Sequence, residues 1–84
     1  MEGTNAERVV LIGRPGCHLC DDARSIVAEV CAEAGVAWRE ESLADHPHWA
    51  ARYSELIPVV LVDGHEHASW RVDPVALRRT LQAP

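Results

Sequence analysis

The sequence of 84 residues predicts a single α/β domain with the element order βαβαββα. Two runs of consecutive apolar residues, 9–12 and 59–62, have the composition of strands that are buried on both faces of a sheet. Residues 18–34, between these runs, repeat apolar side chains with a helical period. The dipeptide Asp63-Gly64 after the second run is a hairpin signal, so a further strand follows it.

The first half of the chain contains two strands around one long helix. The first strand covers residues 8–12 and ends at Gly13. The helix over residues 18–34 ends at Gly35, and its apolar residues lie within an arc of roughly 140°. This arc contains Leu19, Cys20, Ala23, Ile26, Val27, Val30, Cys31 and Ala34. In residues 36–41 apolar and charged side chains are interleaved, which indicates a strand at the edge of the sheet.

The second half contains a short helix, a hairpin and a last helix. Residues 47–53 form the short helix, and the apolar strand 59–62 follows it. After the hairpin, the mostly polar residues 66–70 form a second edge strand, and Asp73-Pro74 is typical of a helix start. A right-handed crossover makes the first two strands parallel, and the hairpin makes the last two antiparallel. We therefore expect a domain of two or three layers.

The composition argues against two classes of partner. A formal net charge of −5 without a basic stripe disfavours binding to nucleic acid. The apolar runs are much shorter than the roughly 18 residues of a membrane-spanning helix, so we expect no membrane partner. The first eight residues lack the apolar core of a secretion signal, which favours a cytoplasmic location. We also expect a monomer.

The motif CHLC, residues 17–20, places two cysteines at the junction of a buried strand and a helix. Free backbone N–H groups and the helix dipole favour an anion at such a junction, which lowers the pKa of a thiol. The spacing allows a second sulfur to attack a mixed disulfide that the first has formed. We therefore predict that Cys17, on the exposed side, is the catalytic nucleophile and that Cys20 resolves the mixed disulfide.

The third cysteine, Cys31, is separate from this motif. It shares the apolar face of the predicted helix, which is typical of a small buried residue. A reactive or regulatory thiol is the alternative interpretation.

A zinc site is an alternative for the CxxC motif. Zinc needs four ligands, and the chain has no second CxxC pair. His65 and His67 follow a strand that carries them about 15 Å away from Pro58, which is too far if Pro58 lies near the cysteines. We expect no bound metal.

Three segments together resemble a glutaredoxin-like member of the thioredoxin superfamily: VVLIGRPGCHLCDDA, IPVVLVDG and VDPVALRRTL. This resemblance implies a thioredoxin-like fold with a four-stranded mixed sheet flanked by helices. It also implies that Cys17 and Cys20 are a redox pair and that Pro58 is a cis proline facing them. By the same resemblance, Ile57 offers backbone hydrogen bonds to the bound thiol partner.

Other residues near the motif differ in how well they match that family. Arg14 resembles the basic residue with which glutaredoxins contact a carboxylate of glutathione. Residues 68–73 lack the family's Gly-Gly and acidic pair, and they are closer to redoxins that receive electrons from thioredoxin reductase and serve ribonucleotide reductase. The implied reductant is therefore a small thiol, such as glutathione or an analogue, or NADPH through thioredoxin reductase. Trp70 and Arg71 are candidates for partner recognition, the alternatives being core packing and a solvated charge.

Charged residues around the motif are expected to adjust the Cys17 thiol. Asp21 and Asp22 in the first helical turn oppose a thiolate, and Arg14 and Arg24 offset part of this effect. We therefore expect a Cys17 pKa closer to neutrality than to the lower end of the range for such thiols. His18, inside the motif, either adds positive charge that stabilises the reduced form or is a surface residue.

These observations predict a small thiol-disulfide oxidoreductase without a bound cofactor. Its substrates would be disulfide-containing proteins or mixed disulfides of low-molecular-weight thiols, and a separate reductase or thiol would restore the dithiol. The alternative is a non-enzymatic protein of the same fold that binds a metal or an iron-sulfur cluster or acts as an interaction module.

Overall fold

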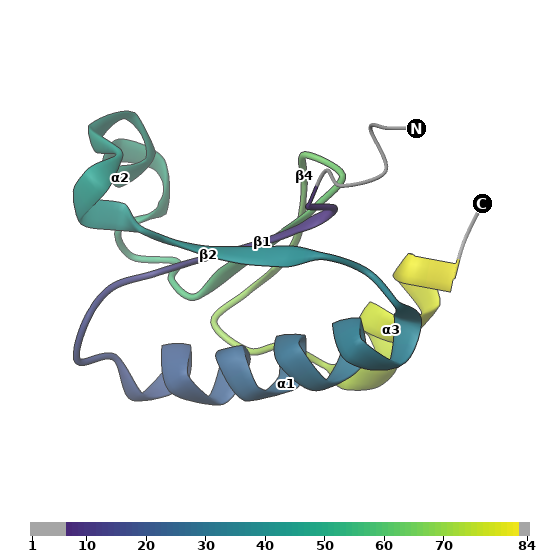
Figure 1. The fold of residues 1–84 in the computed structure, drawn as a ribbon. Coiled ribbons are helices and arrows are strands. Elements are labelled where there is room, and N and C mark those ends of the chain that lie inside the picture. The colour runs from purple at the N-terminus through teal and green to yellow at the C-terminus, as the bar shows by residue number, and fades with distance from the viewer. Residues whose placement is uncertain (1–6, 83–84) are drawn as a thin grey trace.

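Residues 7–82, which the structure describes, form four strands and three α-helices in the predicted order (Figure 1). The structure is a computed structural model. Its elements are β1 (Val9–Gly13), α1 (His18–Ala34), β2 (Trp38–Ser42), α2 (Pro47–Tyr53), β3 (Val59–Val62), β4 (His65–Ser69) and α3 (Pro74–Gln82). A short 3₁₀ turn, Leu43–Asp45, precedes α2 and was not predicted.

The strands form one mixed sheet in the order β2-β1-β3-β4. β1 is parallel to β2, with Val9 opposite Trp38, and antiparallel to β3, with Val9 opposite Val62. β4 pairs with β3 in antiparallel orientation. The two apolar strands, β1 and β3, therefore lie in the centre, and the polar strands lie at the edges, where fewer side chains need to be buried. This confirms the predicted placement.

Helices cover both faces of the sheet (Figure 1). The core on the face covered by α1 and α3 consists of Val9, Leu11, Ala23, Val27, Val30, Cys31, Val60, Val62, Val72, Leu77 and Leu81. The smaller core on the face covered by α2 consists of Val10, Ile12, Cys20, Leu43, Tyr53, Ile57 and Val59. Because Ala23 belongs to the first core and Cys20 to the second, the first turn of α1 lies where the two cores meet.

Burial along α1 differs from the prediction at both ends of the helix. Leu19 and Ala34 belong to the predicted apolar arc, yet both side chains are exposed. The helix has 17 residues and β1 has five, so the helix is about 25 Å long while the strand is about 17 Å long. The ends of α1 therefore extend beyond the sheet, and periodicity alone does not detect this.

The ends of the elements confirm the turn and cap signals of the sequence. Gly35 has a φ of 68° and donates its N–H to the last turn of α1. Asp63 and Gly64 have φ values of 52° and 84°, as a two-residue hairpin turn requires. Asp73 accepts the N–H of Val75 at 2.9 Å. The strand bounds differ from the predicted ones by one or two residues, because β1, β2 and β4 are Val9–Gly13, Trp38–Ser42 and His65–Ser69 instead of 8–12, 36–41 and 66–70.

Candidate active site

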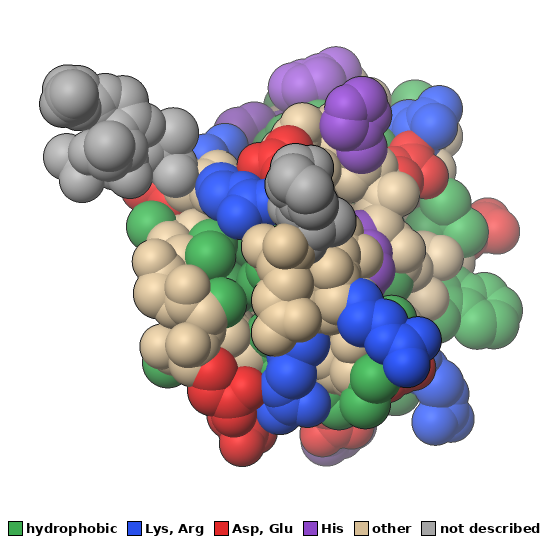
Figure 2. Space-filling model, turned by 90° about the vertical axis from the view of Figure 1, so that its right-hand side faces the viewer, with side chains coloured by type: hydrophobic (Ala, Val, Ile, Leu, Met, Phe, Trp, Pro, Cys, Tyr) green, Lys and Arg blue, Asp and Glu red, His purple; other side chains and the backbone are tan. Residues whose placement is uncertain are grey.

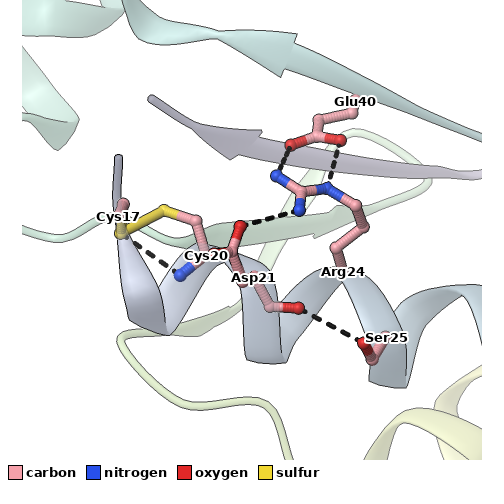
Figure 3. Close-up of polar contacts among 6 residues, drawn as sticks. All are labelled: Cys17, Cys20, Asp21, Arg24, Ser25 and Glu40. Atoms are coloured by element: carbon pink, nitrogen blue, oxygen red, sulfur yellow. Dashed lines mark hydrogen bonds and ion pairs between the residues drawn. A yellow bond between two sulfur atoms is a disulfide. The ribbon is translucent and has the colours of Figure 1, made fainter. Parts of the chain in front are cut away.

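The two cysteines of the CxxC motif lie together at the start of α1 (Figure 3). Cys17 is the N-cap residue, with an extended backbone, and its Sγ accepts the N–H of Cys20 at 3.2 Å. The two sulfurs are joined in a disulfide, with the Cα atoms 5.1 Å apart. Cys17 is half-buried, whereas Cys20 is fully buried. The outer sulfur is therefore the one that solvent and a partner can reach.

Gly13, at the end of β1, makes room for this disulfide. A Cβ atom at this position would lie 2.9 Å from Cys20 Sγ and 3.2 Å from Cys20 Cβ, which is closer than packed side chains tolerate. Sequence reasoning treated Gly13 only as the end of a strand. The one sign of this role in the sequence is that Gly13 lies four residues before Cys17, with only a short loop between them.

The start of α1 favours a negative charge on Cys17. The N–H of Cys20 and the positive end of the helix dipole stabilise a thiolate at the N-cap. Asp21 in the same turn has the opposite effect, but its carboxylate accepts a hydrogen bond from Arg24 at 2.8 Å. Arg24 also donates to both carboxylate oxygens of Glu40 in β2, each at 2.7 Å. The sequence analysis predicted that Asp21 and Arg24 affect the Cys17 thiol, but it did not identify Glu40.

The peptide bond between Ile57 and Pro58 is cis. Ile57 belongs to the same buried cluster as Cys20, and Cys17 packs against this cluster. The carbonyl of Pro58 accepts the N–H of Trp70 at 2.8 Å. Within residues 7–82, no backbone hydrogen bond occupies the N–H or the carbonyl of Ile57, so both groups are free to pair with a bound molecule. The expected cis bond is thus confirmed.

Trp70 is the most exposed large apolar side chain among the residues described. It is 59% exposed and has a φ of 68°, and its indole Nε1 donates to the carbonyl of Glu55 at 2.8 Å. The core-packing interpretation of Trp70 is therefore wrong. A bulky residue with a positive φ is strained, and the hydrogen bond to Glu55 holds the ring at the surface.

A groove of about 630 Å³ lies between the first turns of α1 and the segment after β4. Its apolar lining includes Leu19, Ile26 and Trp70. Arg71 and Asp73 supply charges along the same groove. Trp70 and Arg71 thus lie near the end of the molecule that carries the CxxC motif.

Arg14 and His18 are exposed on the loop and at the first position of α1. Arg14 lines a second hollow of about 380 Å³, together with Arg24 and residues of β2. The structure therefore places Arg14 and Arg71 in different hollows on either side of the first turn of α1.

The remaining cysteine and the start of β4, with His65, lie away from this site. Cys31 is 1% exposed, and burial raises the pKa of its thiol, which confirms its interpretation as a buried residue. His65, the first residue of β4, pairs with Val62, whereas Ser69 at the end of β4 pairs with Val59. Because Pro58 directly precedes Val59, His65 lies at the opposite end of β3 from Pro58. Within residues 7–82, no group of three or more His, Cys, Asp or Glu side chains has an arrangement suited to a metal ion. The same residues include no helix long and apolar enough to span a membrane.

Comparisons with known proteins agree on the fold. The family model described as "Glutaredoxin-like domain (DUF836)" matches residues 8–82. Uncharacterized proteins of Mycobacterium tuberculosis and Mycobacterium bovis are 33% identical over 76 residues, which cover 84% of this chain and 78% of theirs.

Solved structures extend this likeness. The X-ray structure of protein XcR50 from X. campestris is 28% identical, with a TM-score of 0.73 over 90% of this chain and 99% of that chain. A mutant thioredoxin from Halobacterium salinarum, 20% identical, has a TM-score of 0.62 over 94% of this chain and 76% of that chain. The fold of residues 7–82 is therefore thioredoxin-like.

Proposed function

This chain belongs to the family of glutaredoxin-like domains (DUF836), and on that basis we propose that it is a thiol-disulfide oxidoreductase. One observation carries the proposal: a half-buried sulfur at a helix N-cap is bonded to a fully buried sulfur three residues later. The outer sulfur, on Cys17, can meet a substrate, and the inner sulfur, on Cys20, reaches only Cys17. This arrangement suits a nucleophile and a resolving thiol.

The proposed reaction has two exchange steps. The Cys17 thiolate attacks a substrate disulfide and forms a mixed disulfide, while the other half of the substrate leaves as a thiolate and takes up a proton. Cys20 then loses its proton and attacks Cys17 Sγ, which releases the second half of the substrate as a thiol. The substrate has gained two electrons, and the Cys17–Cys20 disulfide has formed. Two electrons from a small thiol, or from NADPH through a reductase, restore the dithiol.

Residues around the disulfide are proposed to bind the substrate. Ile57 belongs to the cluster that Cys17 packs against. Its N–H and carbonyl, which have no backbone partner within residues 7–82, would suit an extended peptide or a small thiol, and Pro58 would keep that segment in place. Arg14 supplies a cation for a carboxylate of a small thiol such as glutathione or an analogue. His18 supplies a polar side chain directly after the nucleophile.

The groove beside Trp70 favours a protein disulfide as one class of substrate. Trp70 and Leu19 are 59% and 42% exposed, and exposed aromatic side chains that are held in place are typical anchors for protein partners. Arg71 would add a charged contact at the same edge. We propose a reducing compartment such as the cytoplasm, because the buried Cys31 is a free thiol, which is compatible with reducing conditions.

The first experiment tests the redox pair itself. The purified protein is treated with and without a reductant, and its mass is measured. A reversible gain of two hydrogens, confined to the fragment with Cys17 and Cys20, is expected. Stoichiometric zinc or a brown chromophore in the protein as purified would instead support a metal or iron-sulfur protein and contradict the proposal.

A second experiment identifies the reductant and the substrate class. NADPH consumption is followed with thioredoxin reductase or with glutathione and its reductase, using a protein disulfide or a small mixed disulfide as substrate. Trp70→Ala is expected to lower kcat/KM for the protein disulfide by about tenfold, with a much smaller effect on the small substrate. Val75→Ala is the matched control, because Val75 is 50% exposed and lies outside the groove. Equal losses for both substrates would remove Trp70 from partner binding.

A further inference from the structure

Ion pairs connect the start of α1 to the sheet directly beside the disulfide (Figure 3). Arg24, one helical turn after Cys20, donates from Nη1 to Asp21 Oδ1 at 2.8 Å. Its Nε and Nη2 donate to the two carboxylate oxygens of Glu40, each at 2.7 Å. One guanidinium therefore holds an acid of the helix and an acid of β2 at the same time.

This network fixes Arg24 more firmly than a single surface ion pair would. An exposed pair of one cation and one carboxylate is usually mobile and contributes little. Here the planar guanidinium of Arg24 makes a two-pronged contact with Glu40, whose backbone is paired with Leu11 in the sheet. The hydrogen bond to Glu40, followed by the one to Asp21, raises the pKa of Arg24 above its ordinary value. The cation is therefore permanent.

Asp21 is the first carboxylate after the CxxC motif. It follows Cys20 immediately, and its N–H donates to the carbonyl of Cys17 at 3.1 Å. A carboxylate that moved freely at this position would repel a thiolate at the N-cap. In the structure the Asp21 carboxylate instead accepts a hydrogen bond from Arg24, which also binds Glu40 (Figure 3).

We propose that Arg24 is a positioning residue that holds the Asp21 carboxylate toward β2, with Glu40 as its anchor, and thereby keeps Cys17 ionised in the reduced protein. The inference rests on the proposed function, because the ionisation of Cys17 matters there for its attack on a disulfide. Its test does not depend on that function, because the ionisation of Cys17 can be measured without any disulfide substrate.

Other charged or titratable groups lie on the loop before α1, in its first turn and on the elements around the site. They are Arg14, His18, Asp22, Glu41, Asp45, His46, His48, Tyr53, Glu55, Arg71 and Asp73. All of them are retained in every variant compared below. Their influence on Cys17 therefore cancels in the comparison.

The experiment measures the pH dependence of Cys17 alkylation by iodoacetamide. All variants carry Cys20→Ser, so that only Cys17 and the buried Cys31 are thiols. Arg24→Gln is expected to move the midpoint of the pH–rate curve upward by about half a pH unit, and Asp21→Asn downward by a similar amount. In the Asp21→Asn background, Arg24→Gln should have a much smaller effect. Equal shifts in both backgrounds would show that Arg24 acts only as a distant charge and would overturn the proposal.

Two further variants separate position from charge. Arg78→Gln removes the same charge from a comparable contact with Glu33, formed at 2.7 and 3.4 Å at the other end of α1, and it should leave the midpoint unchanged. Arg24→Lys keeps the charge but loses the two-pronged contact, so an intermediate midpoint is expected. A wild-type midpoint in Arg24→Lys would contradict the role of Glu40 as an anchor. A protein that alkylates as expected but reduces no disulfide would count against the proposed function and not against this inference.

Discussion

The two ends of α1 carry cysteines in opposite surroundings. At the start of the helix, Cys17 is half-buried, caps the helix and accepts the N–H of Cys20. Near the end of the helix, Cys31 is 1% exposed within the core between the sheet and α3. Burial there raises the pKa of the Cys31 thiol, because a thiolate would lose its hydration. One helix thus contains an accessible sulfur at its N-cap, where a thiolate would be stabilised in the reduced protein, and a shielded sulfur whose burial disfavours a thiolate.

Ion pairs are present at both ends and do not account for this difference. Arg24 joins the start of α1 to Glu40 of β2, and Arg78 of α3 joins the end of α1 at Glu33. Figure 2 looks onto the latter end of the molecule and shows acidic and basic side chains interspersed on its surface. On the proposed function, solvent access and free helix N–H groups make Cys17 the reactive thiol, and the neighbouring ion pair adjusts that reactivity.

The largest effect is expected when the accessible sulfur is removed. Cys17→Ser should abolish disulfide reduction, because no other sulfur can form the mixed disulfide at the surface. Cys31→Ala, the control at the other end of α1, should retain turnover and lose about 1 kcal/mol of stability through the missing buried group. NADPH-coupled turnover and thermal unfolding measure the two effects. Loss of activity in a folded Cys31→Ala variant would contradict the contrast between the two ends.

The second effect concerns the reactivity of the two sulfurs in the reduced, folded protein. Iodoacetamide should modify Cys31 at least about 100-fold more slowly than Cys17, because Cys31 reacts only after local unfolding and its thiol stays protonated. The rates are read from the masses of the fragments that contain each cysteine. In concentrated urea the two rates should become similar. Comparable rates in the native protein would show that Cys31 is accessible.

The third effect compares glycines on either side of α1. Gly13→Ala should destabilise the protein by about 1–3 kcal/mol and lower turnover by about tenfold, because the added Cβ would lie 2.9 Å from Cys20 Sγ. Gly35→Ala should cost about 1 kcal/mol, because its φ of 68° strains an alanine, and it should leave turnover unchanged. Urea unfolding and turnover separate the two cases. A Gly13→Ala variant with normal turnover would show that Cys20 tolerates displacement.

The smallest effect concerns the ion pair at the end of α1. Arg78 lowers the pKa of Glu33, so the folded-state value lies below the unfolded one. The resulting stability is present above the ordinary pKa of about 4.3 and is lost as the pH falls through the folded-state value. Wild type should therefore have a slightly higher Tm than Glu33→Gln at pH 7, and the difference should shrink as the pH falls below about 4.3. Both proteins should show the same pH dependence of the Cys17 alkylation rate. A difference would contradict the expectation that an ion pair at the end of α1 does not affect the thiol at its start.

Local patterns in the sequence suffice for the elements and for the redox pair. The apolar runs of β1 and β3, the αL residue Gly35 and the Asp63-Gly64 turn depend on residues that are adjacent or one helical turn apart. The same holds for Cys17 and Cys20, whose spacing brings both sulfurs to one helix start. The position of Ile57 near that start was expected only from the resemblance to a family.

The surroundings of the redox pair depend on residues that are distant in the sequence. Glu40 meets Arg24 across 16 positions, and Gly13 lies against Cys20 although a loop separates them. Trp70 is held at the surface by the carbonyls of Glu55 and Pro58. Such contacts arise from the strand register and from how far a helix extends beyond its sheet. Neither can be read from a short window of residues, because each requires that separate elements have already packed against one another.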